Sequence, residues 1–390
     1  MGKQRHAEVI GAGLGGLTAA AALARNGWSV RLHERQSEIR AAGAGIYVWD
    51  NGLSALEAVG AFTDATRGAH IGPAVEGRSH LGNTLYRIGI NADRAPRCFT
   101  LLRDRLIRSL VATAEDAGVE VVTGSTATRA HPDGRVEFRG SPDVTADLVV
   151  AADGVHSRLR DQLRLVERRI RMKQGAARMM IPASPEHVPA GDAPLHLEYF
   201  RGRRRLLYTP CTPDSTYVAL VSDTTDDATR ESPVNALSWH RSFPTLGPLI
   251  EELGRATARW DTFELIRLRS WSCGRVALLG DSAHAQPPYL GQGGGTAMTN
   301  AVALAAEVSR RDIPLGSALV AWENKRRPGV EQTQRTSYRM RLLNAVPDVV
   351  RNPLLSAVGR SPMYARPQLA ATRIRTSLSS SAIHEPERSR

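Results

Sequence analysis

An acidic residue, a proline and a run of glycines follow one another within the segment 280–295. Asp281 comes directly after the apolar run 276–279, which is typical of a buried strand, and Pro288 lies in the turn that follows. A glycine-rich helix start lets bare backbone approach a flat polar ligand and points free amides at it. We therefore predict that Asp281 and the amides at this helix start bind such a ligand. The candidates at the helix start are Gly293, Gly294, Gly295 and Thr296.

A second glycine-rich turn lies near the N-terminus, between expected strands at 7–10 and 29–33. Its spacing is GxGxxG, and an alanine-rich segment at 14–26, expected to be a helix, follows it. The first two glycines let the backbone approach a pyrophosphate, and the third lets the helix pack against the sheet. Glu34 ends the second strand, where its carboxylate is placed to accept hydrogen bonds from an adenosine ribose. With the segment 280–295, this turn predicts a flavin dinucleotide. The candidates here are Gly11, Gly13, Gly15, Gly16, Glu34 and Arg35.

A third polar cluster, formed by Asp153, Ser157 and Arg160, follows an expected strand at 147–151. In a turn at the start of a helix, this cluster would brace a pyrophosphate and an approaching nicotinamide. The alternative is a helix capped by Ser157 with an ordinary ion pair at Arg160. The sequence leaves both interpretations open. His284, in the segment described first, is expected to be structural rather than a general base.

Three segments in this order resemble the signatures of single-component FAD-dependent monooxygenases, the para-hydroxybenzoate-hydroxylase-like family: GAGLGG at 11–16, DGVHSRLR at 153–160 and GDSAHAQPPYLGQGGG at 280–295. The resemblance covers about residues 5–345. It implies FAD as the bound cofactor, NADH or NADPH as a transient reductant and O2 as a co-substrate. It also implies that oxygen passes from a flavin C4a-hydroperoxide to an electron-rich ring. Many members have asparagine where Gly295 stands, so a backbone contact is expected to replace one side-chain contact near the flavin.

A closer resemblance is to the methylhydroxypyridine-carboxylate and pyridoxate oxygenases, which hydroxylate and then open a hydroxypyridine ring. It rests on RLHE at 31–34, on GAGIYVW at 43–49 followed by NGL at 51–53, and on LYTPC at 207–211. Val75 stands where those enzymes have a tyrosine near the flavin, so the substrate is expected to differ.

This resemblance implies that Arg205 and Tyr217 hold the substrate, that Tyr47 lies nearby and that Arg103 contacts FAD. General chemistry supports these roles, because an arginine fork suits a carboxylate and a tyrosine hydroxyl orients a ring oxygen. The alternatives are a solvated turn charge for Arg205, within the basic cluster 201–205, and a core position for Tyr217. The substrate-binding candidates are Tyr47, Trp49, Arg178, Arg205, Tyr217 and Tyr289, and the catalytic candidates are Arg205, Tyr217 and Pro288.

We therefore expect an NAD(P)H- and FAD-dependent monooxygenase that hydroxylates a hydroxylated aromatic or pyridine substrate carrying a carboxylate, with ring opening left open. One alternative is a flavoprotein oxidase or reductase of the same fold that transfers no oxygen. Another is a basic binding protein that has a nucleotide fold without catalysis. Flavin-dependent halogenases rely on a lysine between flavin and substrate, and the three lysines of this chain, Lys3, Lys173 and Lys325, come without a WxWxIP segment.

The bulk composition excludes several classes of protein. The chain has 390 residues, 42% of them hydrophobic, and a formal net charge of +12. The arginines that carry this charge are spread along the chain without interleaved aromatic residues, so the charge does not indicate nucleic-acid binding. Apolar runs stay below the roughly 18 residues that span a bilayer.

The cysteines and the N-terminus suggest an intracellular setting. Cys98, Cys211 and Cys273 stand far apart without a CxxC pair, which favours neither a disulfide framework nor a zinc site. Residues 1–6 are polar and lack an apolar signal core. We expect a cytoplasmic protein that binds a small aromatic substrate, without a metal, a nucleic acid or a membrane as partner. A homo-oligomer is left open.

The expected fold class is α/β, with a Rossmann-like FAD-binding domain, a second domain built on a mostly antiparallel β-sheet and C-terminal helices. The first domain is predicted from 1–70, 97–165 and 272–345, and the second from 71–96 and 166–271. A C-terminal extension follows at 346–390, with a tail from 376 expected to be disordered. Segments rich in β-formers predict the antiparallel strands at 195–200, 204–209, 216–222 and 262–268. A helix over 318–341 is expected to be interrupted at Pro328.

Overall fold

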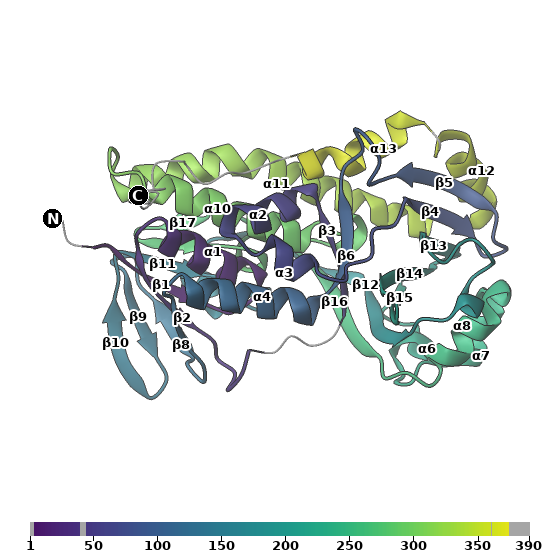
Figure 1. The fold of residues 1–390 in the computed structure, drawn as a ribbon, viewed down its shortest axis with the longest axis horizontal. Helices are drawn as coiled ribbons and strands as arrows, with labels where there is room; N and C mark the ends of the chain where they lie inside the picture. The colour runs from purple at the N-terminus through teal and green to yellow at the C-terminus, as the bar shows by residue number, and fades with distance from the viewer. Residues whose placement is uncertain (1–3, 40–43, 360, 374–390) are drawn as a thin grey trace, which may run out of the picture.

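Two large β-sheets with helices packed against them form the computed structural model, which describes residues 4–39, 44–359 and 361–373 (Figure 1). Figure 1 shows a six-stranded sheet toward one end of the molecule and a seven-stranded sheet toward the other. The seven-stranded sheet is mostly antiparallel, and helices follow it at the C-terminal end, which confirms the predicted fold class. The exact domain boundaries stay a prediction. Gly43 and the tail from residue 376 lie outside the described residues.

The six-stranded sheet is assembled from segments that are distant in the sequence, in the order β17-β18-β11-β1-β2-β7. Its strands are parallel apart from β17. They are β1 (His6–Ile10), β2 (Ser29–His33), β7 (Glu120–Val122), β11 (Leu148–Ala151), β17 (Ser272–Cys273) and β18 (Val276–Leu278). The strands β11 and β18 are fully buried, as expected for a parallel sheet that is covered on both faces.

Helix α1 (Leu14–Arg25) connects β1 to β2 and confirms the predicted β-α-β unit. Its alanines 19–22 are completely buried, and their small side chains let α10 (Gly293–Val308) pack closely against α1. Helix α4 (Arg103–Asp116) packs against α1 as well. These helices and the six-stranded sheet share one large apolar core.

The seven-stranded sheet has the order β16-β12-β15-β14-β13-β4-β5 and is antiparallel except for the pair β13 and β4. Its strands are β4 (Ala74–Ser79), β5 (Thr84–Gly89), β12 (Val166–Pro182), β13 (His196–Arg201), β14 (Arg204–Thr212), β15 (Ser215–Asp223) and β16 (Arg259–Leu268). Because side chains alternate along a strand, each face carries its own set of residues. One face packs its apolar residues against α7 (Ala236–Ser242) and α8 (Gly247–Leu253). The opposite face, here named the inner face, carries Arg205, Leu207, Thr209, Tyr217, Ala219 and Val221, which are paired across β14 and β15.

Smaller elements join these parts. Two short sheets are formed by β3 (Gly45–Trp49) with β6 (Cys98–Leu102), and by β8 (Ala127–Ala130), β9 (Arg135–Phe138) and β10 (Ser141–Thr145). The shorter α-helices are α2 (Asp50–Val59), α3 (Phe62–Thr66), α5 (Arg158–Gln162), α6 (Asp227–Arg230), α9 (Asp281–His284), α12 (Asp348–Val358) and α13 (Pro362–Leu369). The 3₁₀ turns are η1 (Pro185–His187), η2 (Pro244–Leu246), η3 (Pro288–Leu290) and η4 (Ala370–Arg373).

Helix α11 (Leu315–Ala345) runs without a break through Pro328, so the predicted interruption is wrong. A proline inside a helix removes one backbone hydrogen bond and costs about 3 kcal/mol or more. Contacts with the end of β16 hold the turns on both sides of this proline. In Figure 1, α11 extends from the six-stranded sheet toward the seven-stranded sheet.

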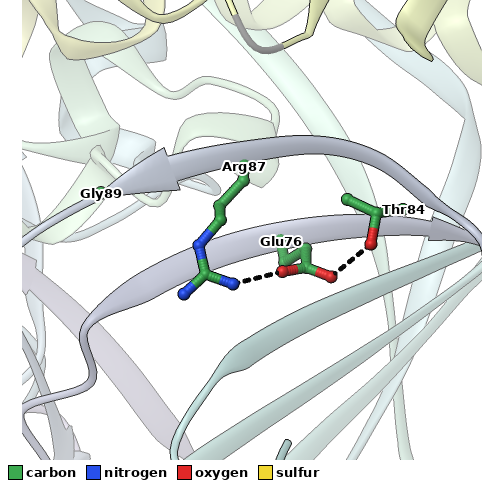
Figure 2. A pocket seen from close by; sticks show the side chains of 4 residues that line it. All are labelled: Glu76, Thr84, Arg87 and Gly89. Atoms are coloured by element: carbon green, nitrogen blue, oxygen red, sulfur yellow. Dashed lines mark hydrogen bonds and ion pairs between the residues drawn. The ribbon is translucent and has the colours of Figure 1, made fainter.

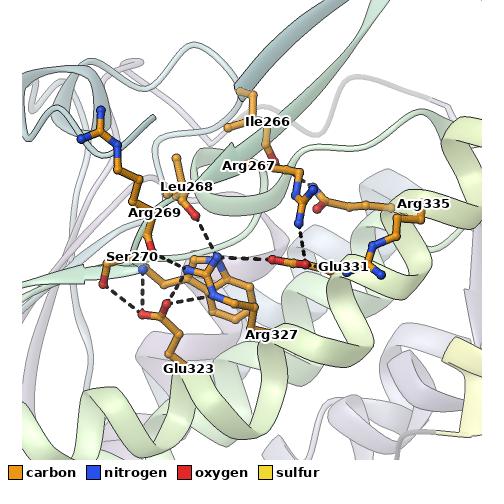
Figure 3. Close-up of polar contacts among 11 residues, drawn as sticks. Ile266, Arg267, Leu268, Arg269, Ser270, Glu323, Arg327, Glu331 and Arg335 are labelled. Atoms are coloured by element: carbon orange, nitrogen blue, oxygen red, sulfur yellow. Dashed lines mark hydrogen bonds and ion pairs between the residues drawn. The ribbon is translucent and has the colours of Figure 1, made fainter. Parts of the chain in front are cut away.

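Figure 3 shows the polar contacts that tie α11 to the end of β16. Arg327 donates to the carbonyl oxygen of Leu268 at 2.8 Å and forms an ion pair with Glu323, one turn earlier in the helix. Glu331, one turn later, forms an ion pair with Arg267 at 2.5 Å. Because both turns next to the proline are anchored in this way, the helix continues where local sequence alone predicts a break.

The C-terminal helices α12 and α13 lie beyond α11, and α12 packs against the edge strand β5 (Figure 1). Among the helices of the described ranges, none combines the length and the apolar character needed to cross a membrane.

Candidate active site

The three turns that the sequence singled out lie at one edge of the six-stranded sheet. They follow β1, β11 and β18, and contain Gly11, Asp153 and Asp281. These strands are adjacent and parallel, so their carboxyl ends meet at the same edge, where open α/β sheets bind ligands. The hydroxyl of Ser282 donates to the carbonyl oxygen of Ala151 at 2.7 Å, which joins the third turn to β11.

The two glycine-rich turns also contact each other directly. A Cβ added at Gly15 would lie 3.4 Å from the Cβ of Ala297, and one at Gly294 would lie 2.9 Å from Leu14 Cδ1. At Gly13 and Gly293, in contrast, an added Cβ would meet no other described part of the chain within 4 Å. Gly15 and Gly294 thus serve close packing, whereas Gly13 and Gly293 border open space that a ligand can enter.

Gly11 and Gly16 hold the first turn against the sheet. Gly11 has a φ of +106°, and an added Cβ would lie 2.5 Å from the carbonyl oxygen of Ala152. A Cβ at Gly16 would lie 1.9 Å from the carbonyl oxygen of Gly11. Both positions therefore exclude any side chain. The close approach of Gly16 to the backbone of Gly11 lets α1 begin directly beside β1.

Glu34 lies beside the glycine-rich turn at the end of β2. Its carboxylate accepts hydrogen bonds from the backbone amides of Ala12 at 3.1 Å and of Gln36 at 3.0 Å. These bonds fix the carboxylate next to the turn rather than leaving it solvated at the strand end. Arg35 is exposed to solvent. That either residue binds a nucleotide stays a prediction.

We infer a groove along this edge from the surroundings of Asp281, Arg103 and Asp153. Asp281 is exposed to solvent, yet burial raises the pKa of its carboxyl group, and the charge of Arg103 opposes the shift. Arg103 is exposed as well, and burial lowers the pKa of its guanidinium. Asp153 is partly accessible, with a pKa raised by burial. These side chains are accessible to water and are also closely surrounded by protein. Side chains with both properties lie in a concave part of the surface.

The cluster around Asp153 agrees with the capped-helix alternative, and its contact with a pyrophosphate or a nicotinamide stays a prediction. Ser157 caps α5 by accepting from the backbone amide of Arg160 at 3.0 Å, and the buried Arg160 forms an ion pair with Asp161 at 2.8 Å. One carboxylate oxygen of Asp153 is buried without a hydrogen-bond partner among the described residues. The helix is therefore capped as in the alternative, and Asp153 retains an unused acceptor at the groove.

Two carboxamides that the sequence did not single out lie beside Gly295. Asn51 accepts from the backbone amide of Gly52 at 2.9 Å, which fixes its orientation, and donates to Gln292 at 3.0 Å. An added Cβ at Gly295 would lie 3.0 Å from Asn51 Oδ1. The side chain of Asn51 thus takes the space that a side chain at 295 would need. Which group contacts a flavin at this place stays a prediction. The sequence signal that could have found Asn51 is a polar residue between the apolar Trp49 and Leu53, a position that the structure shows to be buried.

Arg205 lies on the inner face and is already paired. It is 3% exposed and forms an ion pair with Glu198 at 2.5 Å, so it is not a solvated turn charge. Its guanidinium lies over the rings of Phe200 and Tyr289, 5.3 and 5.6 Å from their centroids. Tyr86 donates a hydrogen bond to the same Glu198. The positive charge therefore belongs to a buried network rather than to an open anion site.

Tyr217 lies toward the other end of the inner face. It pairs with Thr209, four residues along β14 from Arg205, which is about 13 Å. Burial raises the pKa of the Tyr217 hydroxyl, and its hydrogen bond with Arg178 opposes the shift. Arg178 forms an ion pair with Asp261 at 2.6 Å. The structure thus brings Tyr217 together with Arg178 but not with Arg205.

Aromatic residues from β3 and from the turn at Pro288 cover the inner face. Tyr47 shares a hydrogen bond with Thr209 at 2.6 Å, and burial raises its pKa well above the usual value. Tyr289 follows Pro288 in η3 and donates to Gln174 at 2.6 Å. The remaining substrate-binding candidate, Trp49, and Val75, which stands where the related enzymes have a tyrosine, belong to one apolar cluster beside β5.

His284 is structural, as the sequence suggested. Its ring is buried and lies 3.0 Å from the side-chain nitrogen of Asn300, which is itself held by Arg326 at 2.9 Å. Burial lowers the pKa of His284 to about 4, so the imidazole is neutral near pH 7. A neutral ring inside a core network is poorly placed to act as a base on a substrate.

A cavity of about 430 Å³ on the β4–β5 hairpin is not part of this site (Figure 2). Glu76 is its central charge, and the carboxylate accepts from Thr84 and Arg87, both at 2.8 Å. The central carboxylate is thus already paired, which makes the cavity a poor site for a cationic ligand. Within the described residues, no cluster of histidine, cysteine and acidic side chains is suited to hold a metal ion.

Comparison with known proteins agrees with the geometry of the groove. A family model described as the FAD binding domain matches residues 5–335. The chain belongs to the FAD-dependent, para-hydroxybenzoate-hydroxylase-like monooxygenase family. The monooxygenase is 58% identical over 378 residues to the "Probable 2-heptyl-3-hydroxy-4(1H)-quinolone synthase AqdB2" of Rhodococcus erythropolis, covering 97% of this chain and 98% of the relative. It is 56% identical over 369 residues to the "2-heptyl-3-hydroxy-4(1H)-quinolone synthase" of Mycobacteroides abscessus, covering 94% and 98%.

A solved structure extends the likeness to the whole fold of the monooxygenase. The tetrameric form of 2-methyl-3-hydroxypyridine-5-carboxylic acid oxygenase superposes with a TM-score of 0.85 at 36% sequence identity, covering 96% of this chain and 97% of the other. This confirms the predicted likeness to the hydroxypyridine-carboxylate oxygenases. The two sequence relatives named above have a higher sequence identity to the monooxygenase than this solved structure has, and their names refer to quinolones.

The residues of the groove fit FAD. Gly13 and Gly293 leave backbone bare beside open space, as a pyrophosphate and a flat ring require. Asp153 has an unpartnered acceptor, and Asp281 and Arg103 supply one negative and one positive group. We expect the glycine-rich turn and Glu34 to hold the adenosine diphosphate end. The α10 start, with residues 293–296, is expected to hold the flavin end.

Asp281→Asn is expected to weaken FAD binding while stabilising the protein without FAD. The folded-state pKa of Asp281 is raised by burial, so ionisation at neutral pH opposes folding. The wild-type protein therefore gains stability as pH falls through this raised pKa, and the variant lacks that gain. Thermal unfolding at neutral and mildly acidic pH checks the first effect, and FAD titration of the apoprotein checks the second. The exposed, distant Asp312→Asn is the control, and equal behaviour of the two variants would contradict the assignment.

Proposed function

We propose that the monooxygenase hydroxylates C3 of a 2-alkyl-4(1H)-quinolone, with FAD as cofactor and NADH or NADPH as the reductant. The observation that carries this proposal is the similarity, over almost the whole chain, to two proteins named for forming 2-heptyl-3-hydroxy-4(1H)-quinolone. In the balanced reaction, one atom of O2 enters the C3–H bond and the other leaves as water. The nicotinamide supplies the two electrons.

The charges of the inner face favour an uncharged ring over a carboxylated one. A substrate carboxylate would have to compete with Glu198 for the buried Arg205, with which Glu198 already forms an ion pair at 2.5 Å. Separating such a buried pair leaves a charge uncompensated, which is strongly unfavourable. We therefore propose a neutral substrate in place of the carboxylated one expected from the sequence.

The quinolone ring itself directs the reaction to C3. The nitrogen lone pair is conjugated through C2 to C3, so C3 is the electron-rich carbon. When bound, FAD would pass the two electrons of the nicotinamide to O2 and so activate the oxygen. The role left to the protein is to orient C3, to exclude water and to hold the protons of the ring.

Two tyrosines are suited to orient the ring as hydrogen-bond donors. Burial raises the pKa values of Tyr47 and Tyr217, so both hydroxyls are neutral at physiological pH and do not act as bases. We propose that they donate to the quinolone oxygen from the end of the inner face near Thr209. Leu207 and Ala219 give that face an apolar surface against which the ring can lie.

Turnover with the purified holoenzyme tests this proposal. With 2-heptyl-4(1H)-quinolone, NADH or NADPH and ¹⁸O2, we expect a product that is heavier than the substrate by one ¹⁸O atom. A hydroxypyridine carboxylate is the matched comparison and is expected to stimulate little oxidation. The proposal is wrong if only carboxylated rings stimulate oxidation, and reductant consumption that yields only hydrogen peroxide would favour an oxidase.

A further inference from the structure

The polar and apolar sides of α12 are reversed. Apart from Ser356, the side chains that α12 exposes to solvent are apolar: Val349, Val350, Pro353, Leu354, Ala357 and Val358. On its other side, Arg351 is completely buried. In an ordinary surface helix the apolar stripe faces the core and the charges face water. Packing within this chain therefore does not explain why the apolar side of α12 faces solvent.

The exposed residues form one continuous stripe. Their spacing of one and then three positions places them side by side along a single face of the helix. Val349 is 82% exposed and Leu354 is 53% exposed. Four of the nine large hydrophobic residues that the described chain exposes lie on this one short helix. Single exposed apolar residues are common on soluble proteins, but a gathered patch marks an interaction site.

The helix is anchored so that it cannot turn this stripe inward. Arg351 donates to the carbonyl oxygens of Gly202 at 2.8 Å and Leu343 at 3.2 Å, and it forms an ion pair with Asp348. Leu355, on the same side, belongs to the apolar cluster beside β5. Rotation of α12 would expose these groups and would leave buried polar atoms without partners. The outward position of the stripe is thus built into the fold.

Exposed arginines lie close to the start of the stripe and follow it in the sequence. Residues 349–373 contain four arginines and no acidic residue; of these, Arg351 is buried and paired with Asp348, whereas Arg366 is exposed. Arg201, the last residue of β13, and Arg203, in the turn before β14, are exposed, and Arg201 forms an ion pair with Asp348 at the start of α12 at 3.1 Å. Figure 1 shows α12 at the outer edge of the molecule, beyond β5. A second copy of this chain would bring like charges together, whereas an anionic surface complements them.

We propose that α12 docks the monooxygenase onto an anionic phospholipid surface. The valines and Leu354 would enter the boundary between headgroups and acyl chains, and the exposed Arg201, Arg203 and Arg366 would contact lipid phosphates. The expectation of no membrane partner rested on the lack of a spanning run, which a surface helix does not need. Docking would place the enzyme where an alkylated ring of the kind proposed above partitions, although the docking itself does not depend on that substrate.

Vesicle flotation of the full-length holoenzyme tests this proposal. We expect the wild type to float with vesicles of phosphatidylglycerol and phosphatidylcholine, to be released by high salt and not to float with phosphatidylcholine alone. The variant Val350→Ser/Leu354→Ser is expected to lose at least about tenfold of its vesicle affinity. Arg366→Glu, which changes an exposed arginine just after the stripe, is expected to weaken binding to the anionic vesicles.

The matched control is Leu237→Ser/Val320→Ser. These residues are 63% and 54% exposed but lie on α7 and α11, so this variant removes similar apolar surface without touching the stripe. It is expected to bind vesicles like the wild type. Flavin content and thermal unfolding, compared among all variants, show that the fold is intact.

Two results would overturn the proposal. The first is a wild type that does not bind anionic vesicles, or a stripe variant that binds them with the same affinity as the wild type. The other is a stripe variant that dissociates an oligomer of the wild type while neither protein binds vesicles, since α12 would then be covered by a second copy. Turnover of a short-chain, water-soluble quinolone without vesicles tests the proposed function separately, so the two failures can be told apart.

Discussion

Gly16→Ala is expected to abolish the recovery of folded, flavin-bound protein. A Cβ at this position would lie 1.9 Å from the carbonyl oxygen of Gly11, and that oxygen belongs to backbone that cannot rotate away. The methyl group would push α1 away from β1 and distort the turn proposed to hold the pyrophosphate. Overpacking of a core costs about 1–3 kcal/mol or more, which is a large part of the stability of a typical domain. Soluble yield and the flavin-to-protein absorbance ratio measure the effect.

Gly13→Ala is the matched control, and it separates folding from cofactor binding. Gly13 has φ −82° and ψ −179°, which alanine adopts without strain, and no other described part of the chain lies within 4 Å of an added Cβ. The apoprotein is therefore expected to unfold within about 2 °C of the wild type. FAD affinity is expected to fall at least about tenfold, because the methyl group enters the space assigned to the ligand. Unchanged FAD affinity would mean that the cofactor lies elsewhere.

Arg205→Ala is expected to lower the free energy of unfolding by about 3–5 kcal/mol, because it leaves Glu198 as an unpaired charge in a buried network. The double variant Arg205→Met/Glu198→Leu removes both charges and is expected to recover most of the lost stability. Guanidinium unfolding of the wild type and both variants measures these differences. A single variant as stable as the wild type would contradict the structural role of the pair.

The same double variant tests the neutral-substrate proposal. If the ion pair only shapes the inner face, the double variant should bind and hydroxylate the alkylquinolone nearly as well as the wild type. A stable double variant with a strongly raised KM would instead assign Arg205 a direct contact with substrate, as the sequence resemblance implied. Because stability is measured independently, loss of turnover is not confused with unfolding.

The parts of the fold that depend on local sequence were predictable. The β-α-β unit follows from two short apolar strands, an alanine-rich helix and glycines at fixed spacing, and all of these signals lie within 30 residues. The antiparallel strands of the second sheet follow from β-formers separated by turn residues. The edge where the three turns meet also follows, because parallel neighbours end together.

The features that the sequence did not reveal depend on contacts between distant residues. The continuity of α11 at Pro328 depends on Arg327 and Glu331 meeting the end of β16. The pairing of Arg205 with Glu198 depends on the register of β13 and β14. Asn51 fills the space beside Gly295 from another helix. None of these partners is adjacent in the chain, and side-chain types alone do not select one distant partner over another.

The order of the strands at the central edge has a consequence for biosynthesis. Residues that flank the groove come from the first turn of the chain, from its middle and from the region beyond Leu278, since β18 is the last strand to join this edge. A nascent chain on the ribosome therefore has an incomplete groove until about three quarters of its length has emerged. Flavin capture is consequently a late event in the maturation of this enzyme, and C-terminally truncated products are expected to remain colourless.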